Sequence, residues 1–97
     1  MYIKVDFGVE FVPVPANQPM NPVVALQKFD FYGYDCAEVA DLEAASAYVE
    51  DLLNSAFAEC QLPNGIQVIY KDRVCNCCHW VDWKEIDENT FKALVFH

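Results

Sequence analysis

The chain has 97 residues, a formal net charge of −9 and five cysteines, and 55% of its residues are hydrophobic. This length allows one hydrophobic core, so we expect a single domain over residues 1–97, and the hydrophobic content excludes an intrinsically disordered chain. The apolar runs are short and the N-terminus lacks a signal-like pattern, so we expect a cytoplasmic protein with no membrane partner.

Alternating apolar and polar residues predict a first strand from Ile3 to Phe11. Four prolines between Pro13 and Pro22 then predict an extended loop, because proline cannot donate a backbone hydrogen bond. The alternation resumes less regularly from Val23 to Tyr34, which predicts a second strand that contains a bulge and turns Asp30 and Tyr32 outward.

A change of period to 3.6 residues predicts an amphipathic helix from about Asp41 to Glu59, with Asp41 as its N-cap. The apolar side of this helix consists of Leu42, Ala45, Val49, Leu52, Leu53 and Ala56. The opposite side consists of Glu43, Ala47, Glu50, Asp51 and Asn54.

After a Pro63–Gly65 turn, the pattern predicts a strand from Ile66 to Val74. Val74–Cys78 is interpreted as a connector into a strand from Trp80 to Ile86, and Phe91–Phe96 as a final strand, with a short C-terminal helix as the alternative. The predicted order is β-β-α-β-β-β. Because short connections favour hairpins, we expect an α+β fold in which a mainly antiparallel sheet of about five strands carries one long amphipathic helix.

Acidic residues are distributed unevenly along the chain. The segment between Phe29 and Tyr70 contains no lysine or arginine and eight acids, which are Asp30, Asp35, Glu38, Asp41, Glu43, Glu50, Asp51 and Glu59. Such an imbalance adds nothing to fold stability, because like charges repel each other across a compact surface. It suits a protein that binds something basic.

The predicted helix has no basic residue. Solvated helices usually interleave lysine and arginine with acids, because each i,i+4 pair stabilises a helix by a few tenths of a kcal/mol. Glu43 and Glu50 lie roughly 10 Å apart along the helix and can imitate the phosphates of a nucleic-acid strand. An ordinary solvated helix face is the alternative interpretation.

We therefore predict a surface that binds a basic partner protein through acids, an amide and aromatic side chains. Its members are Asp30, Tyr32, Asp35, Glu38, Glu43, Glu50, Asp51, Asn54 and Phe57. Aromatic anchors supply affinity, and charges supply speed and orientation. Alternatively, Phe57 closes the end of the core and the tyrosines cover the sheet. We expect no direct nucleic-acid binding, because the basic residues are few and scattered.

The cysteines support a competing hypothesis, a zinc-stabilised interaction domain. The Cys-x-Cys-Cys-His run departs from the two-residue gaps of common zinc knuckles. If the strand after the helix runs antiparallel to it, this run returns to the helix N-terminus near Cys36, and Cys60 stays at the other end. The weak candidate ligands are Cys36, Cys75, Cys77, Cys78, His79 and His97. Buried thiols need no metal, so our first expectation is free thiols and no cofactor.

The sequence contains no recognisable catalytic constellation. Only three glycines are present and they form no phosphate-binding loop, and there is no Gly-x-Ser-x-Gly elbow. The surrounding acids would raise the pKa of a cysteine thiol and make it less reactive. We expect a protein without enzymatic activity.

The passage Phe31–Asp35 leading into Asp41–Ala45, in a chain of this size and charge, resembles small phage-encoded anti-CRISPR proteins. These are nucleic-acid mimics that target type I surveillance complexes. The resemblance implies an inhibitor that covers a DNA-binding surface of a Cas protein in the cytoplasm of an infected bacterium. An immunity or antitoxin-type protein that neutralises a basic nuclease or toxin is an alternative with the same electrostatics.

Overall fold

The computed structural model describes residues 1–58 and 60–96. It contains five strands and two helices in the order β1, β2, β3, α1, β4, β5 and α2, so the α+β class is confirmed. The strands form a sheet in the order β2-β4-β5-β1-β3. No helix in the described residues is long and apolar enough to cross a membrane.

The chain divides into two compact units. The first comprises Met1–Phe7, Tyr32–Glu59 and Val81–His97, and the second comprises Gly8–Phe31 and Cys60–Trp80. Two strands, β1 (Tyr2–Pro13) and β5 (Arg73–Ile86), contribute residues to both units. The division therefore does not test the prediction of a single domain.

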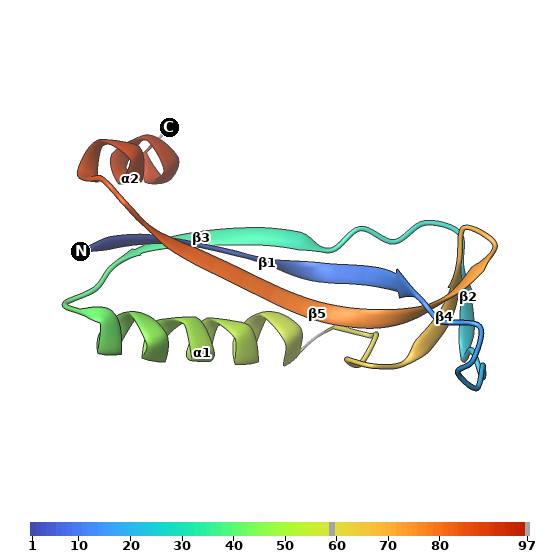
Figure 1. Cartoon of the computed structure of the whole chain (residues 1–97). Coiled ribbons are helices and arrows are strands. Elements are labelled where there is room, and N and C mark those ends of the chain that lie inside the picture. The colour runs from blue at the N-terminus through green and yellow to red at the C-terminus, as the bar shows by residue number, and fades with distance from the viewer. Residues whose placement is uncertain (59, 97) are drawn as a thin grey trace. The chain divides into compact units, whose positions relative to one another are not determined.

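The core of the first unit lies between its strands and helix α1 (Leu42–Ala58), which runs alongside them (Figure 1). The predicted alternation places Ile3 and Val5 of β1 on the buried face, and neither is exposed at all. They form a cluster with Ala45 and Val49 of α1. Half-buried residues surround this cluster, namely Met1, Ala37, Val39, Tyr48, Leu52, Leu53 and Trp83.

Strand β3 (Tyr32–Glu38) pairs with β1 at one edge of the sheet. The backbone groups of Met1 and Val39 exchange two hydrogen bonds of 2.8 Å each. Farther along β1, the Val9 N–H donates to the Phe31 carbonyl at 3.1 Å. Because the partner number falls as the β1 number rises, the two strands are antiparallel.

Helix α1 begins as predicted. Asp41 is its N-cap, with Oδ1 accepting a hydrogen bond from the Ala44 N–H at 2.8 Å. Ala45 and Val49 are buried, whereas Leu42 is 66% exposed, so its assignment to the apolar side is wrong. Leu42 directly follows the N-cap, and the first residue of α1 in the core cluster is Ala45. The predicted end of the helix at Glu59 lies outside the described residues.

The final strand predicted over Phe91–Phe96 is wrong, and the alternative, a short C-terminal helix, is confirmed as α2 (Glu88–Val95). Asp87 caps this helix by accepting the Thr90 N–H at 2.6 Å. The Phe91 ring packs on Tyr2, with centroids 4.7 Å apart. Since Tyr2 and Ile3 point to opposite faces of β1, α2 packs on the face opposite α1.

The core of the second unit consists of Leu62, Val68 and Cys77. Strand β4 (Gln67–Tyr70) pairs antiparallel with β5, with Val68 opposite Cys75. The short strand β2 (Val24–Leu26) pairs with β4 in parallel, with Val24 opposite Val68.

Three predicted boundaries in this region are wrong. The strand from Val23 to Tyr34 is two strands, because Val24 pairs with β4 whereas β3 pairs with β1. The strand from Ile66 to Val74 reverses at Lys71 and Asp72, whose φ angles are 51° and 63°. The supposed connector Val74–Cys78 is the interior of β5, so the predicted β-β-α-β-β-β order becomes β-β-β-α-β-β-α.

The N-cap of α1 gives a stability prediction. Asp41→Ala should lower the free energy of unfolding by about 1 kcal/mol, because the Ala44 N–H loses its acceptor. Asp41→Asn keeps an acceptor and removes the charge, so it should cost less. Equilibrium urea unfolding of the two variants separates the cap from the charge, and equal losses would show that the charge alone matters.

Candidate functional site

The outward face of α1 carries the largest share of the predicted surface. Glu43, Glu50, Asp51 and Asn54 are all exposed, and we call these four residues the acidic helix face. No lysine or arginine occurs in α1, and its last turn has no basic residue to offset the negative helix end. Between described residues, the ion pairs Lys4–Asp6 and Lys92–Glu88 both lie outside α1.

The spacing of these charges follows from helix geometry. Glu43 and Asp51 are separated by eight residues, which is about 12 Å along the axis. Along the axis Glu43 and Glu50 are about 10 Å apart, whereas Glu50 and Asp51 are only about 1.5 Å apart. The face therefore presents negative charge at two positions, Glu43 and the Glu50–Asp51 pair, that a basic surface can contact.

Asp35 of β3 links this strand to α1. Its Oδ1 accepts the Cys36 N–H at 2.9 Å, and its Oδ2 accepts a hydrogen bond from the Tyr48 hydroxyl on α1. Burial, followed by the bond to Asp35, raises the pKa of Tyr48 to about 12. Tyr48 was missed by the sequence analysis, because at helical spacing it reads as one more border residue of the apolar side.

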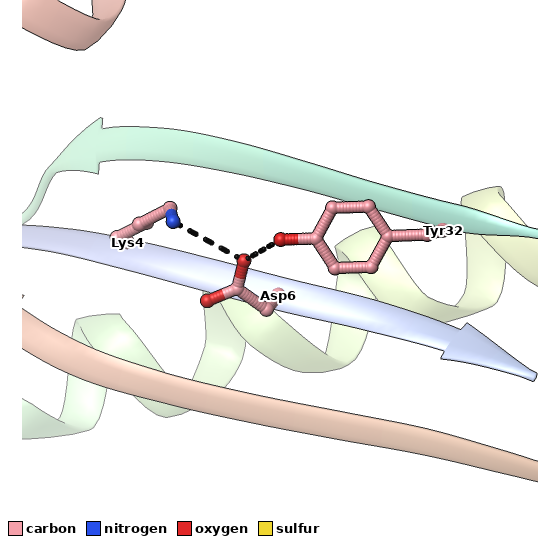
Figure 2. A network of polar contacts seen from close by, with 3 residues as sticks. All are labelled: Lys4, Asp6 and Tyr32. Atoms are coloured by element: carbon pink, nitrogen blue, oxygen red, sulfur yellow. Dashed lines mark hydrogen bonds and ion pairs between the residues drawn. The ribbon is translucent and has the colours of Figure 1, made fainter. Parts of the chain in front are cut away.

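Tyr32 and Glu38 lie on the face of the sheet opposite α1, because they alternate with Asp35 along β3. The Tyr32 hydroxyl donates to Asp6 Oδ1 at 2.5 Å, and Lys4 Nζ lies 3.3 Å from the same oxygen (Figure 2). The hydrogen bond from Tyr32 is the main reason why the pKa of Asp6 is lowered. Tyr32 and Glu38 are therefore separated from the acidic helix face by the sheet.

Lys4 and Asp6 were also missed, although the alternation of β1 marks both as outward-facing. Lys4 Nζ also lies 5.1 Å from the centroid of the Tyr34 ring. Tyr32 and Tyr34 are 59% and 44% exposed, so both side chains cover part of the sheet and remain accessible to solvent.

Phe57 and Asp30 complete the predicted set. Phe57 is half-buried, and its ring meets Phe7 edge-on with centroids 6.3 Å apart, so it extends the core beneath α1. Asp30 is exposed and belongs to the second unit. Of the nine predicted residues, the structure places Glu43, Glu50, Asp51 and Asn54 on one face, with Asp35 at its β3 border.

The cysteines are arranged differently from the topology on which the zinc hypothesis depended. The Cys75–His79 segment is a strand interior, and Cys60, expected at the opposite end from it, lies with its Sγ 3.9 Å from His79 Nε2. That ring nitrogen is also 2.7 Å from the Leu62 carbonyl oxygen, to which it donates as an N–H. Cys36 belongs to the first unit, and His97 lies outside the described residues.

The remaining cysteines can be explained by burial, without a metal. Cys75 and Cys77 are buried, and burial raises the pKa of Cys77 to about 11. Burial, followed by the nearby Asp35 carboxylate, also raises the pKa of Cys36. Within residues 1–58 and 60–96, no three His, Cys, Asp or Glu side chains are grouped as metal ligands would be. The zinc hypothesis stays a prediction without support from this geometry.

Neither the sequence nor the fold identifies a relative. Comparison with protein-family models, with curated proteins and with solved structures found no match. The function must therefore be inferred from the surface itself.

The bond between Tyr48 and Asp35 predicts a pH dependence of stability. Because the folded pKa of Tyr48 is about 12 and the reference value is 10.0, the unfolded chain loses this proton first as the pH rises. The stabilisation is therefore fully present below pH 10 and declines between about 10 and about 12. In urea unfolding at several alkaline pH values, the free energy of unfolding of Tyr48→Phe should lack the part of the decline that Tyr48 causes. Parallel losses in the two proteins would contradict the assignment.

Proposed function

We propose that the protein is an acidic inhibitor that blocks a positively charged, nucleic-acid-binding surface of another protein by mimicking a nucleic-acid strand. The observation that carries the proposal is the acidic helix face, on which three exposed carboxylates stand on one rigid helix without a basic residue. Arginine and lysine side chains that bind phosphates can also bind carboxylates, so a surface occupied by this protein would be closed to nucleic acid.

Rigidity supports this function. The N-cap bond of Asp41 and the Tyr48–Asp35 bond hold α1 at its start and its middle, and Ala45 and Val49 anchor it in the core. Charges on a fixed helix lose little entropy when a partner binds, so more of the electrostatic attraction appears as affinity. The same charges speed association at low ionic strength.

The partner class follows from the resemblance to anti-CRISPR proteins. We propose the DNA-binding surface of a type I surveillance complex as the target, reached in the cytoplasm of an infected bacterium. For this contact we propose only the acidic helix face and the neighbouring Asp35, which is a smaller surface than the nine residues predicted from the sequence. Tyr32 and Glu38 are left out of it because they lie across the sheet, and Phe57 because it packs on Phe7.

Charge reversal tests this surface. The variant carrying Glu43→Lys, Glu50→Lys and Asp51→Lys should inhibit DNA binding by a type I surveillance complex at least about tenfold less well, because attraction becomes repulsion. The readout is the fluorescence anisotropy of labelled target DNA across a panel of type I complexes. A panel of basic nucleases, measured in parallel, tests the immunity-protein alternative.

A matched control separates the position of the charges from their sum. Glu10→Lys, Asp82→Lys and Glu85→Lys change the net charge by the same amount at exposed positions outside α1. This control should inhibit as well as the wild type. If both triple variants lose inhibition equally, only overall charge matters and the proposal is wrong.

A second variant distinguishes a binding face from a merely solvated one. Ala47→Lys with Asn54→Lys places a lysine four residues after Glu43 and after Glu50, and each new pair should stabilise α1 by about 0.3 kcal/mol. A solvated face would gain stability and keep its activity. A binding face should gain stability in urea unfolding and lose inhibition of DNA binding, and unchanged inhibition would contradict the proposal.

A further inference from the structure

Strand β3 ends the sheet in the described part of the chain, so one side of its backbone has no neighbouring strand. The direction of each backbone group follows from the pairing with β1. Val39 exchanges both of its hydrogen bonds with Met1, so its N–H and C=O point toward β1. In an antiparallel pair these directions alternate, so the groups of Tyr34, Cys36 and Glu38 point toward the open edge.

One contact confirms this assignment independently. The Cys36 N–H donates to Asp35 Oδ1 at 2.9 Å, a bond that it could not make while directed at β1. Asp35 therefore lies at the open edge in the middle of β3. Among the described residues, Cys36 and Tyr48 each donate one hydrogen bond to a different oxygen of Asp35, and each carboxylate oxygen has a further lone pair that a cationic donor can use.

The two edge strands of the sheet differ in how they are protected. β2 is three residues long and follows Pro22, and short length and proline are common ways to prevent further pairing. β3 has seven residues and contains neither proline nor lysine. Its charged residues are the acids Asp35 and Glu38, which repel an acidic strand and attract a basic one.

These observations identify the chemistry of the occupant. A second copy of this chain carries a net charge of −9 and would bring the same acids to the edge, so self-pairing is opposed. A strand with lysine or arginine opposite Asp35 would place a cation on the same face as the Asp35 carboxylate, while its backbone would bond to Tyr34 and Glu38. Asp51 lies one helical turn after Tyr48, so α1 adds a further carboxylate on the β3 side.

We propose that the open edge of β3 binds an extended, lysine- or arginine-rich segment of the partner protein as an additional strand. This inference rests on the proposed function, because it assigns a second contact to the same basic partner. Backbone hydrogen bonds from Tyr34 and Glu38 supply affinity, and Asp35 selects a basic side chain. The acidic helix face then contacts the folded basic surface of the same partner, beside the added strand.

A synthetic nonapeptide of alternating lysine and threonine is the probe. It should bind the full chain and slow amide hydrogen exchange at Tyr34 and Glu38, as measured by NMR. The same peptide with alternate backbone nitrogens methylated keeps its charge and cannot pair, so it should bind roughly tenfold more weakly. A glutamate–threonine peptide should not bind.

Variants at one position test the edge in the protein itself. Tyr34→Pro removes an outward N–H at a position preceded by glycine, where proline is tolerated on an edge strand. Tyr34→Thr removes the ring and keeps the N–H. The peptide should bind to Tyr34→Thr at least about tenfold more tightly than to Tyr34→Pro, because only the proline variant loses a backbone bond. Peptides tested on the wild-type chain do not depend on the folding of either variant.

Several outcomes would overturn the inference. These are equal binding of the methylated peptide, absence of peptide binding, and exchange protection that depends on protein concentration without peptide, which would indicate a second copy at the edge. Failure of the proposed function is recognised separately. If Tyr34→Pro inhibits the surveillance complex normally while reversal of the acidic helix face abolishes inhibition, the proposed function stands and the strand-addition site is wrong.

Discussion

The two hydrogen bonds accepted by the Asp35 carboxylate hold β3 and α1 together, and the position of the acidic helix face depends on them. One oxygen accepts the Cys36 N–H of its own strand, and the other accepts the Tyr48 hydroxyl of α1. A charge with two donors is held in place and partly compensated, whereas removal of one partner would leave a half-buried polar group unsatisfied. The sheet edge and the helix consequently form one fixed element, and the acids on both keep constant positions relative to each other.

In the first unit, the acids that interact with lysines and the acids of the acidic helix face lie on opposite sides of the sheet. Lys4 and Lys84 both act on Asp6, on the face opposite α1, and Lys92 of α2 pairs with Glu88. Asp6 and Glu88 therefore have cations within reach. The acidic helix face has no basic residue on its own helix. Such a division preserves ordinary ion pairing where it adds to stability and leaves an attractive field where a partner can use it.

The cysteines show how a dense motif can follow from the packing of a strand. Cys75 and Cys77 alternate with more exposed residues along β5, and both are buried because alternate residues of a strand share a face. Cys77 belongs to the core with Leu62 and Val68, where a small apolar side chain fits. Its raised pKa keeps the thiol protonated and unreactive at neutral pH.

Local periodicity determined much of this protein. The alternation of β1, the helical spacing of α1 and the N-cap at Asp41 depend on neighbouring residues, and all three could be predicted from the sequence. Only the tertiary structure decided the pairing of β2 with β4, the reversal at Lys71, and the choice between a strand and a helix for the last segment, which is α2. It also decided which acids share a surface, because the position of a carboxylate is set by partners distant in sequence, as Tyr48 is for Asp35.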